Sequence, residues 1–335
     1  MDQVRRQLTR EQIAALQQKS PWRGYAMVVA NWAMIVASFA LVIRYPSIWA
    51  FVVAMIVLGG RHLGLGILMH ECAHRSLVPS PAINDWVGQW LCAAPGNADL
   101  QVYRLYHMTH HVKTGTSDDP DLANYAGYPV SAASFRRKML RDISGLTGVK
   151  AFAALMKLYS YQYPAKLKFG YSYKMQTADG AIGALTQNEA GANGVKYLFW
   201  NSRRIIVVNV IGFGILTLSG HPLAYLLWPL SWLTTYMVFS RIRNAAEHGG
   251  LPGTMTTDMY LNTRTVIARW WERLTVAPNY VNYHFEHHLM PTIPSYHLPR
   301  MHRWLGEAGA LEGAQIVQGY TRVVRELIKP RAAAQ

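Results

Sequence analysis

Three short clusters contain most of the histidines in this sequence. They lie at residues 70–74 (HECAH), 107–111 (HMTHH) and 284–288 (HFEHH). Residues three or four apart on a helix share one face, so each cluster can direct two or three imidazoles toward one point. Neutral imidazole is a ligand for iron, zinc, copper and nickel. A lone histidine on an apolar helix is more often a packed core residue, but three such clusters in one chain predict a metal centre.

A fourth element, RNAAEH at residues 243–248, extends this set. Asn244 and His248 are four residues apart and therefore share a helix face. With His248 the candidate ligands number nine, which is more than one metal ion needs. By itself the element is weak evidence, because a single histidine carries it.

The clusters need elements that bring them to one place, and the apolar segments of the chain predict these elements. Residues 24–43 and 48–69 flank a tight turn, and residues 201–219 and 223–240 form a second such pair. About twenty apolar residues are enough to cross a hydrocarbon core of about 30 Å. We therefore expect an all-α integral membrane protein with four transmembrane helices in two hairpins and a cytoplasmic helical cap that carries the site. Pro229 is expected to kink the fourth helix.

The composition favours the same class. Hydrophobic residues make up 51% of the chain and charged residues only 15%, and the net charge is +15. A typical soluble protein is about 25% charged, so the composition excludes an ordinary cytosolic enzyme and a disordered chain. The two cysteines exclude a disulfide framework.

The distribution of basic residues predicts the orientation. Lysine and arginine number five in residues 1–23, fifteen in 75–204 and eleven in 241–335. Basic segments stay cytoplasmic, so we expect the active site and both termini on the cytoplasmic side of the bacterial inner membrane. The basic excess places a cytoplasmic face beside anionic lipid; it either serves only to set this topology or also attracts an acidic redox partner, and no nucleic-acid partner is expected.

The expected organisation has three parts. A cytoplasmic N-terminal segment at 1–23 lacks the apolar core of a cleavable signal peptide. A membrane domain follows at 24–305, and a cytoplasmic tail at 306–335. Within the domain, residues 82–94 form an amphipathic segment that is expected at the membrane interface, and residues 178–194 are rich in Gly, Ala and Asn, which predicts a mobile loop.

At the histidine clusters the sequence resembles the membrane fatty acid desaturase/hydroxylase family. The resemblance covers about residues 24–305, with the three clusters in order and two spans between the second and the third. The segments at 118–121 and 289–294 also resemble those of the family. The resemblance implies two iron ions and, at Asn244, a side chain that holds a water molecule near one iron. The implied iron ligands are His70, His74, His107, His110, His111, His248, His284, His287 and His288.

The resemblance also implies the reaction. Breaking an unactivated C–H bond needs a strong oxidant, which reduced iron and O₂ supply. The chain contains no His-Pro-Gly-Gly sequence, and its third cluster begins with His rather than Gln, so it does not resemble desaturases with a fused cytochrome b5. We expect electrons from a separate ferredoxin, or from a cytochrome with its reductase, and desaturation of a fatty acyl substrate in the membrane. The alternative is hydroxylation of a lipid, carotenoid or other hydrophobic substrate at the same ligand set.

Carboxylates near the clusters are candidates to orient the imidazoles. Each is equally consistent with a solvated surface group or a helix cap. The candidates are Glu71, Asp118, Asp119, Asp121, Glu247 and Glu286.

Two other functions fit part of the pattern. Residues 70–74 match HExxH, the zinc metallopeptidase signature, with His70 and His74 as ligands and Glu71 as general base. A membrane metalloprotease leaves the other two clusters and His248 unexplained. A metal carrier or sensor would place ligands along a path within the spans, whereas these ligands lie at one end of them. Metal content separates the three functions, because the oxygenase needs iron and the protease needs zinc.

Overall fold

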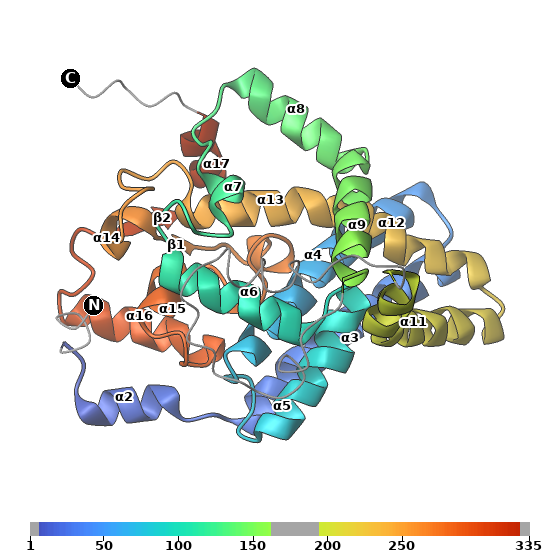
Figure 1. The fold of residues 1–335 in the computed structure, drawn as a ribbon, viewed down its shortest axis with the longest axis horizontal. Helices are drawn as coiled ribbons and strands as arrows, with labels where there is room; N and C mark the ends of the chain where they lie inside the picture. The colour runs from blue at the N-terminus through green and yellow to red at the C-terminus, as the bar shows by residue number, and fades with distance from the viewer. Residues whose placement is uncertain (1–6, 162–193, 329–335) are drawn as a thin grey trace.

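The computed structural model describes residues 7–161 and 194–328, and this part of the chain is mostly helical (Figure 1). The predicted mobile loop at 178–194 lies, except for its last residue, outside the described residues. The first helices in chain order are α2 (Arg10–Gln17), α3 (Pro21–Arg44), α4 (Ile48–Ala73), α5 (Pro81–Val87), α6 (Leu100–Lys113), α7 (Leu122–Tyr125), α8 (Ala132–Ile143) and α9 (Leu146–Tyr159). The later helices are α11 (Gly194–Leu218), α12 (Leu227–Leu233), α13 (Thr235–His248), α14 (Met259–Asn262), α15 (His284–Leu289), α16 (Leu298–Glu307) and α17 (Tyr320–Ile328).

Among the described residues, three helices are long and apolar enough to cross a membrane: α3, α4 and α11. The side chains of Ser20 and Ser47 cap α3 and α4 by accepting hydrogen bonds from the backbone N–H groups of Arg23 and Ala50. Pro46 lies in the short turn between the two helices, where a proline stops the first helix from continuing. The predicted first hairpin therefore corresponds to α3 and α4.

The predicted fourth span at 223–240 is not one helix. It contains a 3₁₀ turn at Pro222–Leu226, then α12 and the start of α13. The break between the two helices falls at Thr234, where φ is −119° and ψ is −87°, and not at Pro229. Pro229 lies in the first turn of α12, where a missing N–H is tolerated. The expected kink at Pro229 is therefore replaced by a break five residues later, and the four-span topology stays a prediction.

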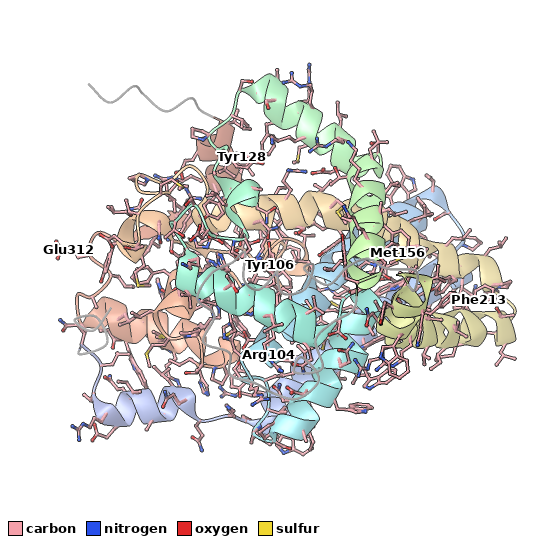
Figure 2. The ribbon with its side chains drawn as sticks, viewed as in Figure 1. Arg104, Tyr106, Tyr128, Met156, Phe213 and Glu312 are labelled. Atoms are coloured by element: carbon pink, nitrogen blue, oxygen red, sulfur yellow. The ribbon has the colours of Figure 1, made fainter. Side chains whose placement is uncertain are left out.

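Helix α4 is the most buried of the three long helices and packs against α3, α12 and α13. A Cβ atom at Gly59 would lie 2.3 Å from Thr235 Oγ1, and one at Gly60 would lie 2.1 Å from the carbonyl oxygen of Leu274. Only glycine permits these approaches. Helix α11, which carries the labelled Phe213 in Figure 2, is far more exposed.

Helices α5 and α6 pack against α4, and Arg104 and Asp85 mark this contact at the C-terminal end of α4. Arg104, labelled in Figure 2, ties α6 to this end, because its guanidinium donates to the carbonyl oxygens of Ala73 (2.9 Å) and Cys72 (2.8 Å). The same guanidinium pairs with Asp85 on α5 at 2.6 Å. The predicted interfacial segment 82–94 forms α5 and a π-helical turn at Gly88–Ala93.

A two-stranded parallel sheet, which the all-α expectation omits, connects the C-terminal segment to the body. Strand β1 (Arg264–Ile267) pairs with β2 (Gln315–Gln318). Helix α17 follows β2 and buries Val323 and Leu327 completely. The described part of the predicted tail, 306–328, is thus packed on the rest of the protein.

Candidate metal centre

The histidine clusters lie on four helices that meet at one place. The first cluster ends α4, the second is on α6, His248 ends α13, and the third cluster opens α15. Their donor nitrogens form two groups, and within each group the donors all lie within 4.8 Å of one another. The five-histidine group contains His70, His74, His107, His111 and His287, and the four-histidine group contains His110, His248, His284 and His288.

Helix geometry explains how the clusters divide between the groups. Histidines four residues apart share a helix face and enter the same group, as do His107 and His111 in one case and His284 and His288 in the other. The histidine between them lies about 60° from the first and about 100° from the second around the helix axis, and it enters the other group. The two groups adjoin, because the rings of His111 and His288 are 4.4 Å apart. Each HxxHH cluster therefore contributes to both groups.

The spacing of nitrogens in the five-histidine group suits one ion. The Nε2 atom of His107 lies 2.9 Å from the Nε2 atoms of both His74 and His111, and His111 Nε2 lies 3.0 Å from His287 Nε2. Two nitrogens about 2.1 Å from a common ion are about 3.0 Å apart at a right angle and about 3.4 Å apart in a tetrahedron. The observed distances fit the right angle, which is found in five- and six-coordinate sites.

In the four-histidine group, His248 is fixed by the backbone. Its Nδ1 donates to the carbonyl oxygen of Asn262 at 2.8 Å. This bond selects the tautomer whose Nε2 carries the lone pair. That Nε2 lies 2.9 Å from His284 Nε2, while the Nδ1 of His284 lies 3.3 Å from Glu247. Both rings thus direct their Nε2 atoms toward the centre of the four-histidine group.

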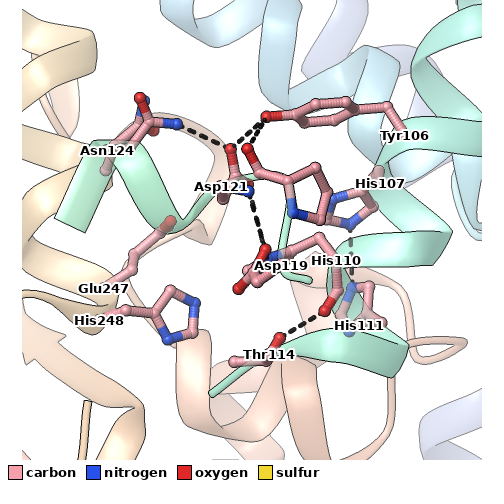
Figure 3. Close-up of polar contacts among 12 residues, drawn as sticks. Tyr106, His107, His110, His111, Thr114, Asp119, Asp121, Asn124, Glu247 and His248 are labelled. Carbon is pink, nitrogen blue, oxygen red and sulfur yellow. Dashed lines mark hydrogen bonds and ion pairs between the residues drawn. The ribbon is translucent and has the colours of Figure 1, made fainter. Parts of the chain in front are cut away.

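His110 is held by a network of acids and tyrosines (Figure 3). Its Nδ1 is 2.8 Å from Asp119 Oδ1 and 3.6 Å from Asp121 Oδ2. Asp119 also accepts hydrogen bonds from the Tyr125 hydroxyl (2.5 Å) and from the Asp121 backbone N–H (2.8 Å). Tyr106 donates to Asp121 at 2.8 Å. This network fixes the ring orientation of His110.

Two ring nitrogens in these groups have no partner within the described residues. They are the Nε2 atoms of His70 and His288, and both atoms are buried. An unpaired buried polar atom is costly, and coordination of a metal ion removes that cost. The donor chemistry and these two atoms therefore fit a bound metal ion in each group.

Most of these imidazoles favour the neutral form. Burial, with the nearby histidines, holds the pKa well below its ordinary value at His107, His111, His284 and His287. For His110 burial also lowers the pKa, but the hydrogen bond to Asp119 and the charge of Asp121 outweigh it, so the pKa of His110 is raised. A neutral imidazole can offer its lone pair to a metal without first losing a proton.

Four of the six candidate carboxylates contact a histidine of the two groups. Besides Asp119 and Asp121 at His110, these are Glu247 at His284 and Glu71, which lies 3.3 Å from His70 Nδ1. Each can receive the second ring N–H of its histidine.

The remaining two carboxylates have other partners. Glu286 accepts a hydrogen bond from Thr265 Oγ1 (2.6 Å) and pairs with His302. Asp118 is exposed and pairs with Lys113 at 3.4 Å. Within the described residues, neither of these carboxylates pairs with a histidine of the two groups.

Asn244 is half-buried on α13, one turn before His248. Its Oδ1 accepts a hydrogen bond from the Arg243 guanidinium at 2.9 Å. Its role in holding a water molecule stays a prediction.

Sequence reasoning missed two of the contributors. The carbonyl of Asn262 has no signature in any sequence, since every residue carries one. Arg243 forms a 2.6 Å ion pair with Glu247, and the i, i+4 spacing of the two residues could have indicated it. His302, which the sequence did not single out either, pairs with Glu286 and contacts neither group through it.

Comparison with known proteins agrees with this geometry. The model of the fatty acid desaturase family matches residues 46–320. The chain is 27% identical over 251 residues to the dihydrorhizobitoxine desaturase of Bradyrhizobium elkanii, a match that covers 74% of this chain and 65% of that protein. It is 29% identical over 93 residues to the sn-1 acyl-lipid omega-3 desaturase (ferredoxin) of a Synechocystis species, which covers 28% of this chain and 23% of that protein. The chain thus spans less than two thirds of either relative.

The family match extends over most of the chain and includes all three histidine clusters. The helices that carry these clusters bring them together in two adjoining groups. This protein therefore belongs to the fatty acid desaturase family.

Proposed function

We propose that this protein is an O₂-dependent di-iron membrane oxidoreductase that desaturates a fatty acyl substrate. The observation that carries the proposal is the pair of adjoining histidine groups, with five and four donors. One iron in each group accounts for all nine imidazoles. Imidazole donors suit iron and disfavour calcium and magnesium, which prefer oxygen ligands.

A zinc metalloprotease is a poorer explanation of the same residues. A catalytic zinc takes three protein ligands and one water, and the nine histidines of the two groups exceed that need. The general base of the HExxH motif must also be free to face a metal-bound water. Glu71 is instead engaged through Oε2, which accepts from the Ser295 N–H (2.8 Å) and the Ser76 hydroxyl (3.0 Å).

The protein's own residues have distinct roles in this proposal. Two bound irons, with O₂ and two electrons, would supply an oxidant able to take hydrogen from an unactivated carbon. Asp119, Glu247 and the Asn262 carbonyl orient the imidazoles through their second ring nitrogens. Burial of the rings excludes bulk water, which would otherwise quench a strong oxidant.

A small cavity borders histidines of both groups. It measures about 10 Å³, room for roughly one water molecule, and it borders His70, His284 and His287. Ile67, Val281 and Leu298 supply apolar walls. An acyl carbon could approach the metal-binding nitrogens here once the walls move apart.

The proposed setting is the bacterial inner membrane, with the centre and both termini on the cytoplasmic side. The basic segments support this orientation. The centre lies at the C-terminal end of α4, so a substrate could keep its chain in lipid and its polar end in water. A separate ferredoxin, or a cytochrome with its reductase, would deliver electrons. The name of the Synechocystis relative includes ferredoxin, which supports a ferredoxin as the electron donor here.

Hydroxylation is the second candidate function. Both reactions begin with removal of one hydrogen from carbon, and they differ in whether a second hydrogen leaves or a hydroxyl group is added. The names of both relatives favour desaturation.

Two measurements test the proposal. Metal analysis of the purified protein should find about two irons per chain. Mass spectrometry of lipids from cells with and without the gene should show products that lack two hydrogens. One zinc per chain and no iron would overturn the di-iron proposal. Products that gain one oxygen would replace desaturation by hydroxylation.

A further inference from the structure

A second, larger cavity lies beside the candidate metal centre. It has a volume of about 610 Å³, within the usual range for ligand sites. We call it the arginine cavity, because Arg23, Arg61 and Arg273 all line it. These residues come from α3, α4 and the turn at Glu272–Leu274.

The three arginines are not neutralised by the protein. Within the described residues none of them forms an ion pair with a carboxylate, and Arg61 donates instead to Asn31 Oδ1 and to the Leu274 carbonyl oxygen, both at 2.9 Å. Arg23 and Arg273 are exposed at the cavity, and Arg61 is only 2% exposed. The buried Nε of Arg61 has no hydrogen-bond partner in the described structure. Three unpaired positive charges around one cavity favour an anionic ligand.

One wall of the cavity is apolar, while Asn31, Asn279, Tyr280 and Tyr296 add polar groups elsewhere in the lining. One face of α3 contributes Ala26, Met27, Ala30 and Met34 to the same cavity. Such an apolar wall would make no favourable contact with a free inorganic anion. The combination of arginines and an apolar face matches an amphiphile with an anionic group and a carbon chain.

A strained turn separates the arginine cavity from the metal centre. Asn279 and Tyr280 have φ values of 54° and 65°, which side chains other than glycine rarely adopt. Two bonds hold Asn279 in place: it donates to the Gly64 carbonyl (2.7 Å) and accepts from Asn31 (3.2 Å). Asn31 in turn accepts from Arg61 at 2.9 Å. The buried arginine and the strained turn are therefore one connected unit.

The turn also borders the histidines. Tyr280 lines the arginine cavity and the small cavity next to His70, His284 and His287. Tyr296 lines the arginine cavity, and its neighbour Ser295 lines the small one. One layer of side chains thus separates the arginines from the candidate metal centre.

We propose that the arginine cavity binds the anionic group, a carboxylate or a phosphate, of the amphiphile whose chain is presented to the metal centre. The inference rests on the proposed function, because it assigns the class of substrate for that site. Arg23 and Arg273 contact the anion, and Arg61 supplies positive charge from the cavity floor. Tyr280 must turn aside for the chain to reach the histidines.

The test measures binding, with no turnover needed. Full-length protein is stripped of metal by chelation, placed in phosphatidylcholine nanodiscs, and titrated with dodecanoate, dodecyl phosphate and dodecanol; binding to empty nanodiscs is subtracted. Both anionic probes should bind at least about tenfold more tightly than dodecanol, since bonds to charged groups exceed neutral ones by about this factor. Higher salt should weaken the binding of the two anionic probes and leave the binding of dodecanol unchanged.

Variants locate the site. Arg23→Gln and Arg273→Gln should each weaken dodecanoate binding about tenfold. Arg303→Gln, an exposed arginine on α16 outside the cavity, is the matched control and should bind as the wild type does. Equal binding of dodecanol and dodecanoate, or no effect of Arg23→Gln and Arg273→Gln, would overturn the inference. Inorganic phosphate that binds as tightly as dodecyl phosphate would also overturn it, in favour of a free anion.

The two proposals fail separately. If the iron-loaded protein is active but Arg273→Gln leaves KM and kcat for an anionic substrate unchanged, the arginine cavity is not the substrate site and the proposed function stands. If the predicted pattern of binding holds but the protein contains zinc and no iron, the proposed function is wrong and the cavity still binds anionic amphiphiles.

Discussion

Replacement of Asp119 by asparagine tests how the protein holds the metal of the four-histidine group. Asp119 Oδ1 lies 2.8 Å from His110 Nδ1, and its carboxylate also accepts from Tyr125 and the Asp121 N–H. Burial raises the pKa of Asp119, but the bonds to His110 and these donors outweigh burial, so its pKa is lowered and it is charged at neutral pH. The Asp119→Asn side chain would keep the shape of the carboxylate and lose its charge.

The size of the effect follows from the bond that changes. A hydrogen bond to a charged acceptor is worth about 1–2 kcal/mol more than one to a neutral acceptor, which is about tenfold in binding. Loss of a group that orients a ligand typically costs 10–100-fold in metal affinity. We therefore expect Asp119→Asn to weaken one of two iron sites by about tenfold or more.

Dialysis against increasing chelator, followed by iron analysis, measures this change. The iron content of the Asp119→Asn variant should fall from about two irons per chain to about one, at chelator concentrations at which the wild type keeps both irons. Asp118→Asn is the matched control, because Asp118 is next in sequence but pairs with Lys113 at the surface. Equal retention of iron by Asp119→Asn and the wild type, or equal loss from Asp118→Asn, would refute the reasoning.

Three further predictions concern other residues. His287→Ala should reduce turnover below about a hundredth of the wild-type value, because loss of a ligand should cost more than loss of its orienting partner; near-normal turnover by the purified, membrane-inserted variant would contradict this. Asn244→Ala should reduce turnover less than His248→Ala, since a water-mediated contact is easier to replace; the opposite order would contradict the roles assigned to them. Gly59→Val should lower the free energy of unfolding of the solubilised protein by about 1–3 kcal/mol, because the valine side chain would collide with Thr235. An unchanged melting temperature would count against the packing of α4 on α13.

The sequence predicts short-range patterns well in this protein. Three of the four apolar segments correspond to α3, α4 and α11, and the i, i+4 spacing correctly pairs His70 with His74, His107 with His111, and His284 with His288. Helix geometry accounts for the division of each HxxHH cluster once the structure is known, but the sequence does not show which histidines of different clusters meet, because that depends on how four helices pack together. The sequence of a single cluster predicts the directions of its side chains around the helix, but it does not predict where they meet the histidines of the other clusters.

Long-range contacts account for what the sequence could not predict. The Asn262 carbonyl reaches His248 only because α14 lies against the end of α13. The break at Thr234 carries no proline or glycine, and Thr235 donates to the Met55 carbonyl on α4 at 2.7 Å, a contact with a helix distant in sequence. Strands β1 and β2 are four residues long, too short for an alternating pattern to stand out, and they pair across about fifty residues of chain.

Diffraction from crystals of the iron-loaded protein at the iron absorption edge tests the central claim most directly, because anomalous scattering locates the metal itself. We predict two iron peaks, one among the Nε2 atoms of the five-histidine group and one among the donors of the four-histidine group. A single peak, or a zinc signal confined to His70 and His74, would contradict the claim.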